Sequence, residues 1–281
     1  MYKRQWYVRE IEQPAGFVLD DTIYPVTIGA DGQVVEIEIV NRYVRGNIHL
    51  TKVDSEYPDN KLTGATFEVY KDSNANGKMD DGDELLGTLT EKEKGEYSMN
   101  DLFYGRYFVK ETKAPEGFVL DTGVYEVMID TNGKTYEVEN KAGVGFINDA
   151  MRGNLKIVKT SSDGKVKGFA FRITGANGYD IILETNDKGE IFIDGLRIGD
   201  YTISEVSNSA SSMYVIPADK KATVKIGSTT IVEMHNVLRD TPKTGDTTNL
   251  PLLYALAGLS AVGIAVCGVI GFKKKKKEDR N

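Results

Sequence analysis

Cysteine and histidine are nearly absent from this chain, and each shortage excludes a class of chemistry. The single cysteine, Cys267, lies in an apolar run near the C-terminus, so the residues before that run can form no disulfide bond. His49 and His235 are the only histidines, and neither a Ser/His/Asp triad nor a histidine-based metal site can be drawn from the sequence. We therefore expect a protein that is not an enzyme acting on an external substrate.

Basic charge and helical periodicity are also scarce. The net charge is −7 and lysines are interspersed among the acidic residues, which argues against binding to nucleic acid or anionic lipid. Short alternating or β-branched runs, separated by Gly, Asn and Asp turns, predict an all-β fold of antiparallel sandwiches. The runs are residues 65–70, 124–129, 169–174 and 222–226, with turns at Asn132-Gly133, Asp163-Gly164 and Asp194-Gly195.

The chain repeats itself. Residues 6–20 align without gaps on residues 107–121, and residues 41–52 align on residues 148–159. A third, looser copy begins near residue 152. No signal peptide is visible at the start, so we expect a fragment whose upstream part is missing. The expected divisions are the C-terminal part of one domain at 1–45, complete domains at 46–151 and 152–239, a motif and linker at 240–249, a transmembrane helix at 250–272 and a basic cytoplasmic tail at 273–281.

Each copy places the same polar side chains on the strand face that points to the apolar interior. Lys52, for example, is in phase with Ile48 and Leu50, because alternate residues of a strand point the same way. Asn140 is the other candidate for the asparagine of the middle set. Only Asn148 lies as far before the next lysine, Lys159, as Asn41 lies before Lys52. The sets are Lys52, Glu111 and Asn148; Lys159, Glu205 and Asn236; and Glu10 with Asn41, whose lysine would lie upstream.

A lysine, a glutamate and an asparagine buried together have two physical outcomes. Burying a charge unpaired costs several kcal/mol, so one outcome is a buried salt bridge with an amide partner. In the other, desolvation lowers the pKa of the lysine and raises that of the glutamate. The neutral amine then attacks the asparagine carbonyl, the glutamate shuttles protons and ammonia leaves. An isopeptide bond between the first and last strands remains.

The segment that follows Glu111 resembles a known family. Glu111, Pro115, Gly117 and Phe118, which follow an aromatic strand, are similar to the E-box of CnaB-type (SpaA-like) sandwiches in Gram-positive pilins and adhesins. Residues 62–70 and 166–173 resemble the second strand of that fold. The resemblance implies a Lys52–Asn148 bond formed with Glu111 and a Lys159–Asn236 bond formed with Glu205. After Glu205 the Pro-x-Gly pattern is missing.

The C-terminus carries a motif, an apolar span and a basic tail in that order. The uncharged run 250–272 can cross a hydrocarbon core of about 30 Å as a helix, and the lysines at 273–277 keep the tail cytoplasmic. The whole resembles the cell-wall sorting signal Leu-Pro-x-Thr-Gly. This resemblance implies that a sortase cleaves after Thr244 and joins it to a peptidoglycan precursor or a pilin lysine. The matching residues are Thr241 (in place of leucine), Pro242, Lys243, Thr244 and Gly245.

One acidic segment has the pattern of a calcium loop. It fits much of an EF-hand loop, with Gly77 at the sharp turn, although a strand and not a helix is predicted before it. The alternative, a solvated acidic hairpin loop, stays open. We expect no cofactor except calcium at this loop. The ligands would be Asp72, Asn74, Asn76, Asp80 and Asp83.

Two functions of different class fit these expectations. The first is a structural stalk or pilin-like subunit on a Gram-positive cell, inserted in the membrane before sortase cleavage and attached to the wall afterwards. The alternative is an adhesin whose sandwich loops bind a host or matrix ligand. Tyr57-Pro58 is followed by Asp59, so the Tyr-Pro-Lys motif of polymerising pilins is not matched, and the sequence leaves polymerisation open.

Overall fold

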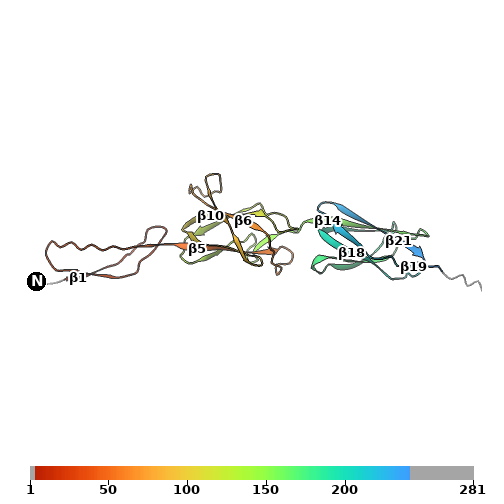
Figure 1. Cartoon of the computed structure of the whole chain (residues 1–281), viewed down its shortest axis with the longest axis horizontal. Helices are drawn as coiled ribbons and strands as arrows, with labels where there is room; N and C mark the ends of the chain where they lie inside the picture. The colour runs from red at the N-terminus through yellow and green to blue at the C-terminus, as the bar shows by residue number, and fades with distance from the viewer. Residues whose placement is uncertain (1–3, 241–281) are drawn as a thin grey trace, which may run out of the picture.

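The computed structural model describes residues 4–240, and these form β-structure almost throughout (Figure 1). An elongated N-terminal segment comes first, and two β-sandwiches follow it end to end. The helical structure in the described residues is a short 3-10 turn, η1 (Ala176–Gly178). The predicted all-β fold is confirmed. Within residues 4–240 no helix is long and apolar enough to cross a membrane; the predicted span, sorting motif and basic tail lie outside the described residues.

The N-terminal segment is formed by two short antiparallel strand pairs. β1 (Arg4–Val8) pairs with β3 (Tyr24–Ile28), and β2 (Phe17–Val18) pairs with β4 (Arg42–Tyr43). Apolar side chains are open to solvent here: Trp6 is 53% exposed and Val34 is 83% exposed. This segment therefore presents an open strand face, in contrast to the closed cores that follow it.

The middle sandwich comprises β5 to β13. One sheet has the order β11-β10-β6-β7, and the facing sheet has the order β12-β5-β9-β8, with β13 also paired to β5. Between the sheets the ring of Phe67 packs against those of Tyr97 and Phe146, at centroid distances of 5.3 and 4.9 Å. The strands are β5 (Arg45–Asp54), β6 (Thr66–Lys71), β7 (Glu84–Thr88), β8 (Thr90–Glu93), β9 (Glu96–Phe103), β10 (Gly105–Lys113), β11 (Val124–Ile129), β12 (Thr135–Glu137) and β13 (Phe146–Asn148).

The C-terminal sandwich comprises β14 to β21. Its sheets have the orders β17-β14-β21-β19 and β16-β15-β18-β20. Its core holds Phe171, Ile203 and Met234, all with no exposed surface. The strands are β14 (Arg152–Ser161), β15 (Ala170–Thr174), β16 (Asp180–Glu184), β17 (Glu190–Arg197), β18 (Gly199–Val206), β19 (Tyr214–Val215), β20 (Lys220–Val224) and β21 (Thr229–Leu238).

The first and last strands of each sandwich run parallel, which the prediction of antiparallel sandwiches did not anticipate. β5 pairs in parallel with β12 and β13, and β14 pairs in parallel with β21. Parallel neighbours need a long connection, and the rest of each sandwich supplies it. Lys52 lies opposite Phe146, and Asp54 lies opposite Asn148. Since residues two apart share a face, Lys52 and Asn148 point to the same side of the sheet.

The turn predicted at Asp194-Gly195 is wrong. These residues lie inside β17, where the register with β14 slips opposite Asn154. The side chain of Asn154 accepts a hydrogen bond from the N–H of Gly195 at 3.1 Å, and Gly195 has a φ of 65°. The pair forms a β-bulge, which needs the same left-handed residue that a turn needs. In the middle sandwich Asp101 takes this position, with a φ of 61° and a hydrogen bond to Asn47.

Candidate functional site: two buried Lys/Glu/Asn clusters

The middle sandwich brings Lys52, Glu111 and Asn148 together in its interior. Lys52 comes from β5, Asn148 from the adjacent β13, and Glu111 from β10 in the facing sheet. All three are buried, as strand parity predicted. The amide nitrogen of Asn148 donates to both carboxylate oxygens of Glu111, at 2.8 and 3.1 Å. The Nζ of Lys52 donates to the carbonyl of Phe146 at 3.0 Å.

Burial shifts the charges of this cluster towards neutrality. Burial lowers the pKa of Lys52 to about 8, against the attraction of Glu111. Burial also raises the pKa of Glu111, although the N–H of Asp121 and the amide of Asn148 oppose the shift. A lysine that is easily deprotonated thus faces a glutamate that is easily protonated. The Oδ1 of Asn148 is buried and has no hydrogen-bond partner.

The C-terminal sandwich repeats the arrangement with Lys159, Glu205 and Asn236, which are all buried. The amide nitrogen of Asn236 donates to Oε1 of Glu205 at 2.6 Å. The Nζ of Lys159 lies 4.1 Å from the centroid of the Phe169 ring. Burial lowers the pKa of Lys159 and raises that of Glu205. Two buried oxygens, Oδ1 of Asn236 and Oε2 of Glu205, have no hydrogen-bond partner.

The N-terminal segment holds the same pair without the amine. The amide nitrogen of Asn41 donates to Oε1 of Glu10 at 2.6 Å, and the N–H of Asp20 donates to Oε2 of Glu10 at 2.7 Å. Residues 4–45 contain no lysine. The carboxylate–amide contact is therefore the same in all three copies, and only the two sandwiches add a lysine.

Asn140, the rival of Asn148, lies beside the cluster and braces it. Its Oδ1 accepts from the N–H of Ile147 at 2.6 Å, and its Nδ2 donates to the carbonyl of Ile147 at 2.8 Å. Its Nδ2 also donates to a carboxylate oxygen of Asp121 at 2.7 Å. Asn140 thus holds the strand that carries Asn148, and Asn148 is the asparagine that contacts Glu111.

Asp121 is a residue of the site that the sequence analysis did not single out. Its N–H donates to Oε2 of Glu111 at 2.8 Å, as the N–H of Asp20 does to Glu10. The gap-free alignment of residues 6–20 on 107–121 ends on these two aspartates, so the repeat itself carried the signal.

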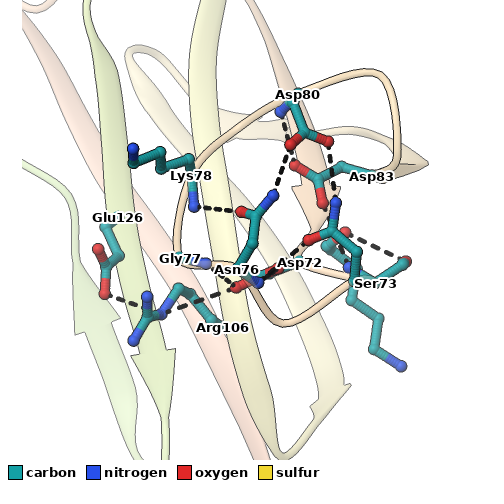
Figure 2. A network of polar contacts seen from close by, with 11 residues as sticks. Asp72, Ser73, Asn76, Gly77, Lys78, Asp80, Asp83, Arg106 and Glu126 are labelled. Atoms are coloured by element: carbon teal, nitrogen blue, oxygen red, sulfur yellow. Dashed lines mark hydrogen bonds and ion pairs between the residues drawn. The ribbon is translucent and has the colours of Figure 1, made fainter.

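The residues predicted to bind calcium lie on one loop between β6 and β7 (Figure 2). The carboxylate of Asp72 accepts the N–H groups of Asn76 and Gly77, at 3.1 and 3.0 Å. Arg106 also approaches it, with Nε 4.0 Å from the carboxylate, as Figure 2 shows. Within residues 4–240 there is no group of three His, Cys, Asp or Glu side chains that could hold a metal ion. The acids organise the loop itself, and calcium binding stays a prediction.

The histidines lie away from both clusters, as strand parity predicted. His49 is on the outer face of β5, between Glu96 at 2.9 Å and Glu137 at 2.7 Å. His235 is exposed on β21 and contacts Thr160. Both imidazoles therefore face solvent, on the opposite side of their strands from the buried lysines.

Comparisons with known proteins agree with this architecture. The family model described as the SpaA prealbumin-like fold domain matches residues 46–142 and 153–237. The trypsin-resistant surface T6 protein of Streptococcus pyogenes serotype M6 is 26% identical over 194 residues, which are 58% of this chain and 34% of that protein. The solved Bacillus anthracis TIE protein is 26% identical, with a TM-score of 0.63 over 83% of this chain and 42% of that one.

A further solved structure is GBS52, the minor pilin of Streptococcus agalactiae, which is 18% identical with a TM-score of 0.33 over 71% of this chain and 98% of that one. The chain spans less than half the length of the T6 and TIE proteins. The family model matches both sandwiches and more than half of the residues. This chain therefore belongs to the SpaA family of prealbumin-like fold domains.

Proposed function

We propose that this protein is a structural component of a Gram-positive cell surface, a stalk or pilin-like subunit whose sandwiches are each stiffened by an isopeptide bond. The observation that carries the proposal is the recurrence of one buried Lys/Glu/Asn cluster, at the same place between first and last strand, in both sandwiches. The printed name of one relative, a surface protein of Streptococcus pyogenes, supports the location.

The reaction needs nothing beyond the three side chains. The neutral Nζ of Lys52 attacks Cγ of Asn148, which forms the new C–N bond. Glu111, protonated beside the neutral amine, gives its proton to Nδ2 as the Cγ–Nδ2 bond breaks and takes one back from Nζ, and ammonia leaves. The product is a neutral secondary amide, so the cost of burying an ammonium ion disappears. The same steps apply to Lys159, Glu205 and Asn236.

The mechanical benefit follows from where the bonds lie. The chain enters the middle sandwich on β5 and leaves it after β13, at opposite ends of that sandwich in Figure 1. A covalent bond between these two strands carries a pulling force from one to the other. The hydrogen bonds between the strands of the sheets are then not loaded. The Lys159–Asn236 bond does the same for β14 and β21. A tether under shear gains resistance from both bonds.

Intact mass tests the cross-links. We expect the chain to be lighter than its sequence mass by one ammonia per bond, and tryptic digestion to release branched peptides that join Lys52 to Asn148 and Lys159 to Asn236. Glu111→Ala should restore one ammonia and abolish the first branched peptide only, and Glu205→Ala the second only. A folded parent chain with its full sequence mass would contradict the proposal.

Attachment to the wall forms the second half of the proposal. A sortase would cut between Thr244 and Gly245 while the span at 250–272 holds the chain in the membrane, and would transfer Thr244 to a peptidoglycan precursor or a pilin lysine. On this proposal the only chemistry the chain performs is a single turnover on itself. Protein released from the wall by a muramidase should end at Thr244 with a cell-wall remnant attached. Peptides that extend beyond Gly245 in that fraction would refute the attachment.

A further inference from the structure

The sheet register defines which residues are equivalent around the two glutamates. Phe118 pairs with Ala150, two residues after Asn148, and Tyr214 pairs with Leu238, two residues after Asn236. Phe118 and Tyr214 therefore occupy the same position. Counting on from each places Pro217 at the position of Asp121, whereas counting back from the paired strands β10–β11 and β18–β20 places Ile216 there, because this stretch is one residue shorter in the C-terminal sandwich.

The two glutamates differ in the hydrogen bonds that hold them. The N–H of Asp121 donates to Oε2 of Glu111 at 2.8 Å. Proline has no N–H, so Pro217 cannot make this bond. The Oε2 of Glu205 is the buried carboxylate oxygen that has no partner. The second site thus lacks one orienting hydrogen bond, and the proline removes one of the two backbone N–H groups that could supply it.

The side chain of Asp121 ties the glutamate to the strand of the asparagine. Its carboxylate accepts from Asn140 at 2.7 Å and from the hydroxyl of Tyr125 at 2.9 Å. Asn140 in turn brackets Ile147, the neighbour of Asn148. The middle sandwich needs this brace because its last strand is interrupted between β12 and β13, whereas β21 pairs with β14 without a break from Thr229 to Asn236.

We propose that Asp121 is the positioning residue of the cross-linking reaction in the middle sandwich, and that Pro217 gives the C-terminal sandwich a different pH range for the same reaction. The inference rests on the proposed isopeptide chemistry. Asp121 acts in two separable ways: its N–H orients Glu111, and its carboxylate, through Asn140, holds the strand of Asn148.

The sign of the pH effect follows from the groups that face each glutamate. Glu111 faces Lys52 from β5, Asn148 from β13 and Asp121 from the loop after β10; Glu205 faces Lys159 from β14 and Asn236 from β21. The reaction requires that the lysine–glutamate pair has lost one of its two protons, so its acid limit follows the protonation of the glutamate. An N–H donor favours the ionised carboxylate and moves that limit to lower pH. Bond formation should therefore persist to lower pH in the middle sandwich.

Pro217→Ala, which restores an N–H, tests the backbone donor. Full-length chain kept unreacted in denaturant is refolded across acid to mildly alkaline buffers, and each branched peptide is quantified over time. The acid midpoint for the Lys159–Asn236 bond should fall by about one pH unit, the size of shift that one hydrogen bond to a charged group produces. The Lys52–Asn148 bond of the same molecules serves as the internal control. An unchanged midpoint for Lys159–Asn236 would overturn the role given to Pro217.

Two neutral variants test the carboxylate of Asp121. Asp121→Ala keeps the N–H but removes the acceptor for Asn140, so the Lys52–Asn148 bond should form about tenfold more slowly. Asp121→Asn keeps an oxygen acceptor and should recover most of the rate. Equal rates for the two variants would overturn the positioning role of the Asp121 carboxylate. Absence of both bonds in the refolded parent would instead refute the proposed function itself.

Discussion

Replacing Lys52 with methionine is expected to destabilise the middle sandwich by about 4–5 kcal/mol, even though it removes a buried charge and keeps an apolar stem of similar length. The Lys52–Asn148 bond lowers the conformational entropy of the unfolded chain, and the variant loses the stability that this provides. The size is estimated from the loop model for a cross-link that closes about 100 residues. Guanidinium unfolding of the full chain, with intact mass recorded on the same samples, measures it.

The same variant separates the two outcomes that the sequence left open. If Lys52 and Glu111 were an unreacted ion pair, a methionine at this buried position would leave stability unchanged or raise it, because the pair's desolvation cost is relieved. Lys94→Met, at an exposed lysine of the same sandwich, is the matched control and should change stability by no more than about 0.5 kcal/mol. A Lys52→Met chain as stable as the parent would show that Lys52 and Glu111 form an unreacted ion pair and that no isopeptide bond is present.

The burial of the two clusters was predictable from sequence because strand parity is local. Ile48, Leu50 and Lys52 alternate on one strand, and a period of two leaves no other face for the lysine. The choice of Asn148 over Asn140 was also predictable, from the repeat spacing. Asp121 could have been found in the same alignment, but an alignment does not show that its backbone N–H donates to Glu111 or that its carboxylate accepts from Asn140.

Other features depend on contacts that no local pattern encodes. The parallel pairing of β5 with β13 and of β14 with β21 follows from closure of the whole sandwich. The bulge at Gly195 resembled a turn because both need a left-handed residue. The contact between the sandwiches joins Asp54 to Arg197, residues 143 positions apart, and no sequence pattern near either residue predicts it.

That contact is a buried ion pair at the junction of the sandwiches. The guanidinium of Arg197 donates to both carboxylate oxygens of Asp54, at 2.6 and 2.7 Å, and to Glu56 at 2.9 Å. Asp54 is fully buried and ends the strand that carries Lys52. Two backbone bonds continue the junction, from the N–H of Ile198 to Met151 at 3.0 Å and from the N–H of Met151 to Gly117 at 2.8 Å.

The backbone part of this junction recurs one step earlier in the chain, without the ion pair. The N–H of Tyr104 donates to Val44 at 3.0 Å, and the N–H of Val44 donates to Gly16 at 2.8 Å. Phe103 stands there in the place of Arg197 and packs against the ring of Tyr43 at 5.4 Å. The backbone bonds therefore set the path of the chain at both junctions, and the Arg197–Asp54 pair adds a charge-assisted contact to the second.

Arg197→Met should uncouple the two sandwiches. Removing one partner of a buried ion pair costs about 3–5 kcal/mol while the other charge stays buried. The domains can avoid that cost only by separating so that Asp54 is rehydrated. With Cys267→Ser and spin labels on cysteines introduced at the exposed Lys92 and Lys221, the parent should give a narrow interspin distance distribution and Arg197→Met a broad one. Arg172→Met, which breaks the exposed Arg172–Asp180 pair within one sandwich, should leave the distribution narrow and the stability almost unchanged. A narrow distribution in Arg197→Met would show that the backbone bonds and the remaining Arg152–Glu56 ion pair fix the junction, and that the Arg197–Asp54 pair adds nothing to its stiffness.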